Sequence, residues 1–147
     1  MEIVVANETH RDVWLSLRKA LWPDCPESRH KIEIEHTLKS AGLVALAMKG
    51  AQAIGFAEVS IRVDHVEGAG DSPIPYLEGW YVSPEYRGQG IGRALVTFAE
   101  NWASDQGYTE MASDAECDNT LSIQIHKTLG FREVGRSVHF IRSLPKN

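Results

Sequence analysis

The chain has 147 residues, the size of one compact domain, of which 43% are hydrophobic and 24% charged. This composition excludes a disordered or fibrous chain, and no apolar run approaches the ~20 residues of a membrane-spanning helix. The net charge of −5 disfavours nucleic acid and anionic membranes as partners. Because the chain start lacks the basic region of a secretory signal, we expect one cytoplasmic domain spanning residues 1–147.

The charge is unevenly distributed along the chain. Residues 63–126 contain eleven acidic and two basic side chains, a net charge of −9. Such a segment suits a cationic substrate, although a solvated acidic face would look the same. Cys25 and Cys117 are too few for a disulfide framework and lack metal-ligand spacing, so we expect no metal site.

Apolar spacing predicts an alternation of strands and helices. In chain order these are a strand over 3–5, helices over 9–22 and 27–41, strands over 43–49, 53–62 and 74–82, a helix over 90–105, a strand over 108–113, a helix over 119–129, and strands over 131–134 and 137–143. Thr9 and Asp12 resemble a capping box, and Pro75 predicts that its strand begins unpaired or bulged. The order indicates an α/β (α+β) fold with a mixed sheet, helices on its faces and one right-handed strand–helix–strand crossover.

A glycine-rich loop stands between a predicted strand and a predicted helix. It reads Glu85-Tyr86-Arg87-Gly88-Gln89-Gly90-Ile91-Gly92-Arg93. Glycines allow close approach of a ligand, and the first amides of a helix, which have no intrahelical acceptor, bind phosphate well. The spacing excludes the dinucleotide fingerprint and the P-loop. We therefore predict that residues 87–93 cradle a pyrophosphate; the alternative is a plain turn before a helix.

The glycine-rich loop and a second motif near the C-terminus resemble the motifs of a known family. Arg87-x-x-Gly90-x-Gly92 resembles the acetyl-CoA signature of the GCN5-related N-acetyltransferase (GNAT) superfamily, and Leu129-Gly130-Phe131 resembles its closing motif. The resemblance implies a mostly antiparallel sheet with about four flanking helices and a splayed parallel pair, residues 76–82 and 108–114. It also implies acetyl-CoA as co-substrate, with pantetheine between the splayed strands and the thioester held by the backbone of Trp80, Tyr81 and Val82.

Two carboxylates stand at positions that suit acyl transfer to an amine. Glu78 lies in an otherwise apolar strand, where a carboxylate is costly to bury unless paired, and Asp114 ends the next parallel strand, where such sheets bind ligands. The acceptor amine must be neutral to attack, and a carboxylate can both bind its ammonium form and take the proton. We expect this of Glu78, with Asp114 holding a neighbouring ammonium. The alternatives are an outward-facing strand position and a turn-forming Asp.

A second, narrower resemblance suggests the acceptor. Blocks similar to the aminoglycoside 6'-N-acetyltransferases are Leu21-Trp22-Pro23, Ser60-Ile61-Arg62, Leu77-Glu78-Gly79, Glu110-Met111-Ala112-Ser113-Asp114 and Asn119-Thr120. The resemblance implies a polycationic aminoglycoside substrate, a role in antibiotic resistance and a homodimer. It implies that Trp22 forms a wall of the sugar site and that Asn119 contacts the pantetheine arm, although Asn119 equally suits a helix N-cap.

Some positions depart from the family's pattern or allow two interpretations. His65 stands where a substrate-facing Tyr is usual, and Gly135 stands where a Glu is usual. His65 could stack on a sugar or simply be solvated. His126 occupies the position of a thiolate-protonating Tyr, and a His can do this near neutral pH, but a His packed on a helix face is an equal alternative. Residues 138–141 could form an edge strand that pairs with a second subunit.

The sequence therefore allows three hypotheses for the function. The leading one is direct acetyl transfer from acetyl-CoA to an aminoglycoside 6'-amine; Cys117 makes a covalent route conceivable. The second is an acetyltransferase of the same fold that acts on another small polyamine or a protein N-terminus. The third is an acyl-CoA-binding module without catalysis.

Overall fold

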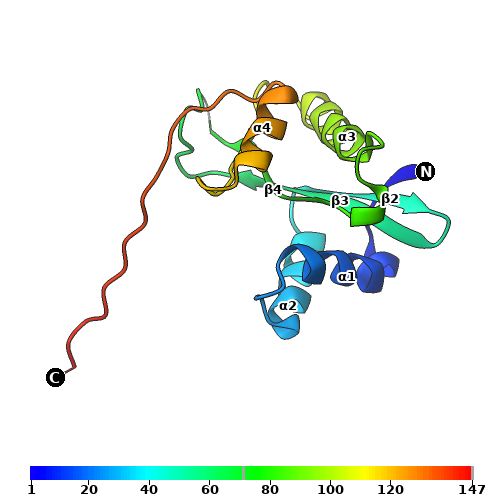
Figure 1. Cartoon of the computed structure of the whole chain (residues 1–147), viewed down its shortest axis with the longest axis horizontal. Coiled ribbons are helices and arrows are strands. Elements are labelled where there is room, and N and C mark those ends of the chain that lie inside the picture. Colours follow the sequence, from blue (N-terminus) through cyan, green and yellow to red (C-terminus); the bar gives the residue numbers. More distant parts are fainter. Residues whose placement is uncertain (71, 147) are drawn as a thin grey trace. The chain divides into compact units, whose positions relative to one another are not determined.

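The computed structural model describes residues 1–70 and 72–146, and the chain divides into two compact units, Met1–Asp114 and Ala115–Asn147. The first unit contains a five-stranded sheet in the order β1-β2-β3-β4-β5 (Figure 1). The strands are β1 (Glu2–Val5), β2 (Leu43–Lys49), β3 (Gln52–Arg62), β4 (Ile74–Val82) and β5 (Ala112–Ser113). All neighbours are antiparallel except β4 and β5, which are parallel.

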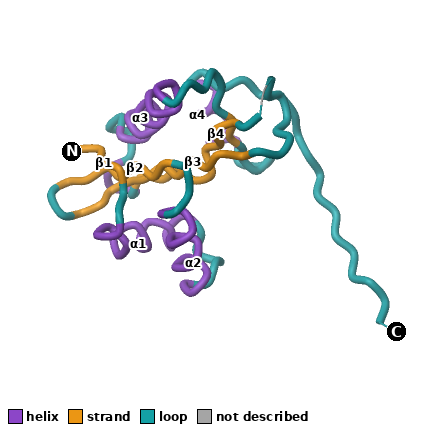
Figure 2. Tube along the Cα trace, turned by 180° about the vertical axis from the view of Figure 1, so that it is seen from behind, coloured by secondary structure: helices purple, strands orange, loops and turns teal. Residues whose placement is uncertain are grey.

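Helices cover both faces of this sheet. The helical elements of the first unit are η1 (Glu8–His10), α1 (Arg11–Leu21), α2 (Glu27–Leu38), η2 (Pro84–Tyr86) and α3 (Ile91–Asp105). Helices α1 and α2 lie on one face and α3 on the other (Figures 1 and 2). Within the described residues, no helix combines the length and the apolar character that a membrane span requires.

The core forms where apolar helix faces meet the sheet. On the α1 and α2 face, Trp14 packs with Leu46 and Phe56, and all three are fully buried. On the other face, α3 contributes Leu95 and Val96 from one apolar stripe. Burial of apolar surface stabilises such packing by about 25 cal/mol per Å², so these contacts fix the sheet that carries the site described below.

The start of the first helical segment is capped differently from the prediction. Asn7 is the N-cap: its side chain accepts from the backbone N–H of Thr9, while His10 Nδ1 accepts from the backbone N–H of Asn7. Asn7 and His10 form the capping box, and no side-chain hydrogen bond caps the start of α1. The predicted capping box of Thr9 and Asp12 is therefore wrong.

Strand β4 begins in register despite its proline. Ile74 and Pro75 pair with Arg62 and Ile61, so the prediction of an unpaired or bulged start is wrong. The irregularity lies further along, because Glu58 pairs with Gly79 while Val59 pairs with Leu77. Glu78 is thus the extra residue of a β-bulge, a feature that redirects side chains and is common beside active sites.

Strand β5 is shorter than predicted, because residues 108–111 are not strand. The Glu110 carboxylate in this segment accepts the backbone N–H of Gly70, which ties the segment to the preceding loop. The ladder between β4 and β5 ends at Leu77 and Ser113, while β4 continues to Val82. The parallel pair is therefore present over two residues, and its splaying stays a prediction because β5 itself ends at Ser113.

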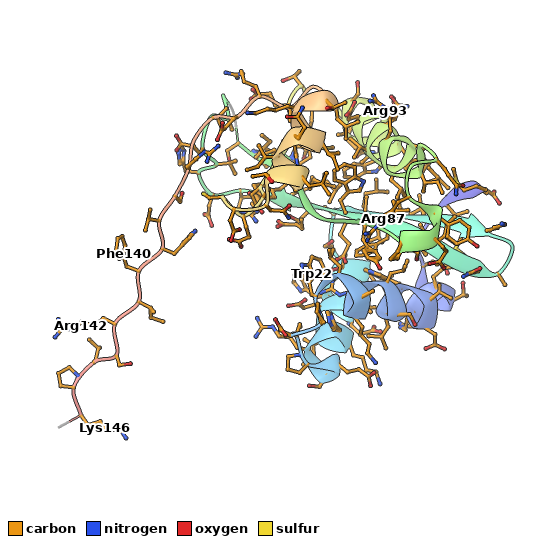
Figure 3. All side chains as sticks on the ribbon, viewed as in Figure 1. Trp22, Arg87, Arg93, Phe140, Arg142 and Lys146 are labelled. Atoms are coloured by element: carbon orange, nitrogen blue, oxygen red, sulfur yellow. The ribbon has the colours of Figure 1, made fainter. Side chains whose placement is uncertain are left out.

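The second unit contains α4 (Thr120–Thr128) and an extended C-terminal segment (Figure 1). Asn119 caps α4 by accepting the backbone N–H of Ser122 at 3.1 Å, and Gly130 ends it with a φ of +98°. The strands predicted over 131–134 and 137–143 are absent from the described residues 131–146, and this prediction is wrong. The large apolar side chains from Val134 onward stay solvent-exposed, and Phe140, on the extended segment in Figure 3, is 91% exposed.

Candidate functional site

The β-bulge places Glu78 among polar side chains of strand β3. Oε2 of Glu78 accepts hydrogen bonds from Ser60 Oγ and from Arg62 Nε, the latter at 2.8 Å. Oε1 accepts from Arg62 Nη2 at 2.7 Å, which makes the ion pair bidentate. Glu78 is exposed, as the outward-facing alternative predicted, and three hydrogen bonds orient its carboxylate.

The same arginine leads to the second predicted carboxylate. Cζ of Arg62 lies 3.4 Å from the centroid of the Tyr76 ring, and the Tyr76 hydroxyl donates to Asp114 Oδ2 at 2.5 Å. Burial raises the pKa of Tyr76 to about 12, and the hydrogen bond to Asp114 adds to the rise. Glu78, Arg62, Tyr76 and Asp114 thus form one continuous network, hereafter the acidic network.

Trp22 lies beside this network at the end of α1. Its backbone N–H donates to the Arg18 carbonyl at 2.8 Å, and its carbonyl oxygen lies 3.1 Å from Nε2 of His30. The indole packs directly over Gly79, where a Cβ atom would come within 2.5 Å of the ring. The structure therefore brings the predicted wall residue next to the predicted base.

Behind Trp22 lies a buried ionic cluster that sequence patterns did not predict. Arg18 Nη1 donates to both oxygens of Glu58 at 2.6 and 2.7 Å, and Trp14 Nε1 donates to the same carboxylate at 3.3 Å. Burial raises the pKa of Glu58, and the positive charge of Arg18 opposes that rise. A buried pair of this kind is strongly destabilising when only one partner is removed, so it fixes α1 on β3.

A set of potential metal ligands adjoins this cluster. Side-chain atoms of Cys25, His30 and Glu33 lie within 4.8 Å of one another. Arg18 donates to Nδ1 of His30 and also pairs with Glu33, and Nε2 of His30 contacts the Trp22 carbonyl. Both imidazole nitrogens of His30 are thus engaged within the protein, and the positive charge of Arg18 lies among the potential ligands. This arrangement does not suit a metal ion.

A groove of about 210 Å³ opens between the end of α2 and the strands that carry the network. Glu58, Ser60 and Glu78 line its sheet side, and Thr37 and Ser40 line its helix side. The C-terminal end of a helix carries partial negative charge. Arg18 and Arg62 already pair with Glu58 and Glu78, so the groove is polar, and an amine gains a carboxylate there only by displacing an arginine.

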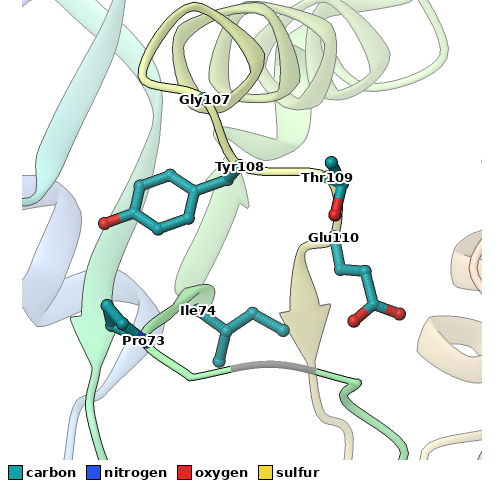
Figure 4. Close-up of a pocket in the computed structure, with 6 residues that line it drawn as sticks. All are labelled: Pro73, Ile74, Gly107, Tyr108, Thr109 and Glu110. Atoms are coloured by element: carbon teal, nitrogen blue, oxygen red, sulfur yellow. The ribbon is translucent and has the colours of Figure 1, made fainter.

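A second, smaller pocket of about 90 Å³ lies at the other end of β4 (Figure 4). Its lining residues are Pro73, Ile74, Gly107, Tyr108, Thr109 and Glu110. Gly107 follows the C-terminal end of α3, whereas the glycine loop precedes its start. Because a helix of 15 residues is roughly 22 Å long, this pocket lies about one helix length from the glycine loop. This pocket includes none of the predicted site residues.

The glycine loop has the backbone conformation that the phosphate prediction requires. Gly88 and Gly90 have φ values of +78° and +82°, which side chains rarely adopt, and no side chain caps the N-terminus of α3. Arg87 Nε donates to the Val82 carbonyl at 2.8 Å, and Trp80 Nε1 donates to the Gly92 carbonyl at 3.0 Å. The loop is thereby fixed to the end of β4, with the side chains of Arg87 and Arg93 on the exposed surface (Figure 3).

Other predicted site residues lie apart from this arrangement or in the second unit. His65 is 83% exposed on its loop, and its nearest charged partner is Glu67 at 3.9 Å, so the structure does not bring it into the acidic network. Asn119 caps α4, as its alternative interpretation predicted. His126 Nδ1 contacts the Ser122 carbonyl at 2.7 Å, and its ring meets that of Phe131 edge-on. The predicted contact of Asn119 with pantetheine and the predicted catalytic role of His126 stay predictions.

The sequence interpretation missed Arg62, Ser60 and Tyr76 as site residues. One signal was present: Glu58, Ser60 and Arg62 place a polar side chain at every second position of an otherwise apolar strand. Such alternation predicts a polar face on that strand. It could not identify the partners, which depend on the bulge in β4.

Relatives of known activity match almost the whole chain. An aminoglycoside N(6')-acetyltransferase type 1 from Salmonella typhimurium is 40% identical over 141 residues, 95% of this chain and 97% of the relative. The protein of the same name from Acinetobacter genomosp. 13 is 44% identical over 142 residues, with the same coverage of each chain.

Solved structures agree in fold. The aminoglycoside acetyltransferase AAC(6')-Iy, in complex with the bisubstrate analogue CoA-S-monomethyl-acetylneamine, matches with a TM-score of 0.91 and 38% identity, covering 97% of this chain and 98% of that one. The 6'-N-acetyltransferase AAC(6')-Ih from Acinetobacter baumannii matches with a TM-score of 0.88 and 40% identity over 98% of this chain and 99% of that one.

The predicted fold class is thus confirmed in its mixed, mostly antiparallel sheet, its one parallel pair and its helices. The predicted class of enzyme, an N-acetyltransferase, is confirmed as well. Residues 7–131 match the model of the acetyltransferase (GNAT) family, and the chain belongs to that family.

Proposed function

We propose that the chain transfers the acetyl group of acetyl-CoA to the 6'-amine of aminoglycosides and thereby confers resistance to them. The observation that carries the proposal is the acidic network, in which a bulge aims Glu78 beside Trp22 and links it to Asp114. Relatives about 40% identical that bear this activity in their names support the same conclusion.

In this proposal, acetyl-CoA binds along the end of β4 and the glycine loop. The pyrophosphate rests on backbone amides of residues 87–93, where the uncapped first turn of α3 offers donors and a favourable dipole. Pantetheine follows β4 beyond Leu77, where the ladder to β5 has ended, with its thioester held by backbone groups of Trp80, Tyr81 and Val82. Asn119 contacts the pantetheine arm.

The acidic network prepares the amine for attack. An alkylamine with a pKa near 10.4 costs roughly 4–5 kcal/mol to deprotonate at pH 7. Glu78 binds the 6'-ammonium and takes its proton, and Asp114 holds a neighbouring ammonium. The neutral nitrogen then attacks the thioester carbonyl; an N–C bond forms, the C–S bond breaks, and the nitrogen loses its second proton to solvent. The coenzyme leaves as a thiolate that takes a proton from His126, and His126 regains one from solvent.

The assembly and location of the protein complete the proposal. The family match continues past Asp114, which supports a single acetyltransferase domain over residues 1–147.

The exposed apolar side chains Val138, Phe140 and Ile141 support a homodimer that covers the C-terminal segment. Light scattering tests this point: Phe140→Asp should dissociate a dimer, and a monomeric wild type would contradict it. A cytoplasmic location stays a prediction.

Acetyl transfer is tested with pairs of aminoglycosides that differ only in an amine or a hydroxyl at the 6' position, by following free thiol. The proposal predicts thiol release with the amines alone. Turnover only of other polyamines or of peptides would instead indicate another substrate class, and coenzyme binding without turnover of any amine would indicate a non-catalytic module. Full activity of Cys117→Ala would exclude a covalent route through that thiol.

The role of Glu78 has a matched control on the same unit. Glu78→Gln keeps the shape of the side chain but removes its charge, and should lower kcat/KM by ~10² or more. Glu35 is also held by a bidentate arginine, Arg11, so Glu35→Gln reproduces the loss of an ion pair away from the site. Near-normal turnover of Glu78→Gln would remove Glu78 from the mechanism.

A further inference from the structure

Arg62 puts a positive charge inside a site that is otherwise built to receive cations. Its guanidinium forms both ionic hydrogen bonds to Glu78 and stacks on Tyr76, whose hydroxyl binds Asp114. One resident cation thus lies between the two carboxylates of the acidic network. Nothing in the chemistry of acetyl transfer to an amine requires a positive charge at this point.

The hydrogen-bonding capacity of Glu78 shows how Arg62 limits the binding of an acceptor. An ionised carboxylate has about four acceptor positions. Ser60 and the two Arg62 donors fill three of them, which leaves one, on Oε1. An arriving ammonium can use only that one position while Arg62 stays in place, and the guanidinium beside it repels the ammonium charge.

The geometry also allows Arg62 to leave. The Arg62 and Glu78 side chains are 42% and 32% exposed, and ion pairs at such positions contribute little net stability. The stack on the Tyr76 ring involves the face of the guanidinium and is separate from its hydrogen bonds to Glu78. Arg62 can therefore release Glu78 and remain stacked or solvated.

We propose that Arg62 competes with the acceptor for Glu78: it occupies this carboxylate in the empty site and is displaced by the acceptor's ammonium group. Displacement costs the same for every acceptor. A sugar with one ammonium has only Glu78 to offset that cost, whereas an acceptor with several ammonium groups also engages Asp114. The inference rests on the proposed function and extends it to the choice of acceptor.

The test compares two acceptors in thiol-release kinetics at low salt. One is an aminoglycoside with several ammonium groups, and the other is methyl 6-amino-6-deoxyglucoside, which has one. Arg62→Met removes the resident cation, and we expect it to lower the KM of the single-amine sugar by about tenfold. The aminoglycoside avoids the same displacement, so its KM should fall by a similar factor. Arg62→Lys, which keeps the charge, should behave more like the wild type than Arg62→Met does.

The matched control is Arg11→Met, because Arg11 also forms two hydrogen bonds to a carboxylate, that of Glu35. Arg11 is at the start of α1, away from Trp22, which follows the end of that helix. This variant should leave both KM values unchanged, and equal urea midpoints for the two methionine variants would show that both fold. An unchanged or higher KM of the single-amine sugar in Arg62→Met would overturn the inference. If the wild type acetylates no amino sugar, the proposed function fails instead, and calorimetric binding of the same two sugars still tests Arg62.

Discussion

Gly79→Ala is the sharpest test of how the site is packed. A methyl group at this position would lie 2.5 Å from Cη2 and 2.9 Å from Cζ2 of the Trp22 ring, whereas ordinary contacts begin near 3.4 Å. The indole would therefore have to move by about 1 Å. Its backbone cannot follow, because the N–H of Trp22 is bonded to Arg18 and its carbonyl contacts His30.

The surroundings of the ring set the cost of that movement. Trp22 lies between the Arg18 guanidinium, 4.8 Å from its ring, and the edge of Phe56, with centroids 6.1 Å apart. Both neighbours are buried, so neither can yield freely. Overpacking of this kind costs about 1–3 kcal/mol of stability. A displacement near 1 Å at a substrate-positioning residue lowers turnover by up to about 10²-fold.

Urea denaturation and aminoglycoside kinetics measure the two effects separately. The control is Gly70→Ala, where a methyl group would meet only Glu110 Oε1 at 3.4 Å and should change the free energy of unfolding by less than about 0.5 kcal/mol. Gly79→Ala should raise the aminoglycoside KM and leave the acetyl-CoA KM unchanged. A Gly79→Ala protein with wild-type stability and an unchanged aminoglycoside KM would refute the packing of Trp22 on this strand.

Three further predictions concern stability and proton transfer. Glu58→Gln should lower the free energy of unfolding by about 3–5 kcal/mol in urea titrations, because it leaves Arg18 buried without its main partner; a loss below about 1 kcal/mol would contradict the buried pair. Because the folded protein holds the Tyr76 proton up to a pKa of about 12 and the unfolded chain loses it near 10, stability should fall between these pH values. In thermal unfolding, Tyr76→Phe should lack this part of the fall in stability at alkaline pH. A stability profile identical to that of the wild type would refute the role of Tyr76. His126→Phe should lower kcat by about tenfold or more, and an unchanged kcat across pH would remove His126 from the mechanism.

Local patterns predicted most of the first unit because its helices bury one face each, while its central strands are buried on both faces and so are near-continuous apolar runs. The hairpin of β2 and β3 and the full length of β4 follow from apolar runs with a turn between them. The C-terminal strands failed for a physical reason. The apolar residues over 138–141 have strand propensity, but a strand also needs a partner, and propensity does not supply one.

The site was predictable where one residue contradicted its surroundings. Glu78 stood out as a carboxylate in an apolar strand, and the glycines before α3 indicated an anion loop. Arg62 could not be assigned in the same way, because its contact with Glu78 depends on the register of β3 and β4 and on the bulge at Glu78. Tertiary pairing of this kind leaves little trace in the spacing of one sequence.

The central claim is that the glycine loop holds the nucleotide while Glu78 receives the sugar amine. A crystal structure of the chain with coenzyme A and an aminoglycoside tests it most directly. The account predicts the diphosphate within hydrogen-bonding distance of amides between Arg87 and Arg93, and the 6'-amine against Glu78 with Arg62 displaced. A diphosphate bound elsewhere, or a Glu78 side chain directed away from the thiol, would contradict it.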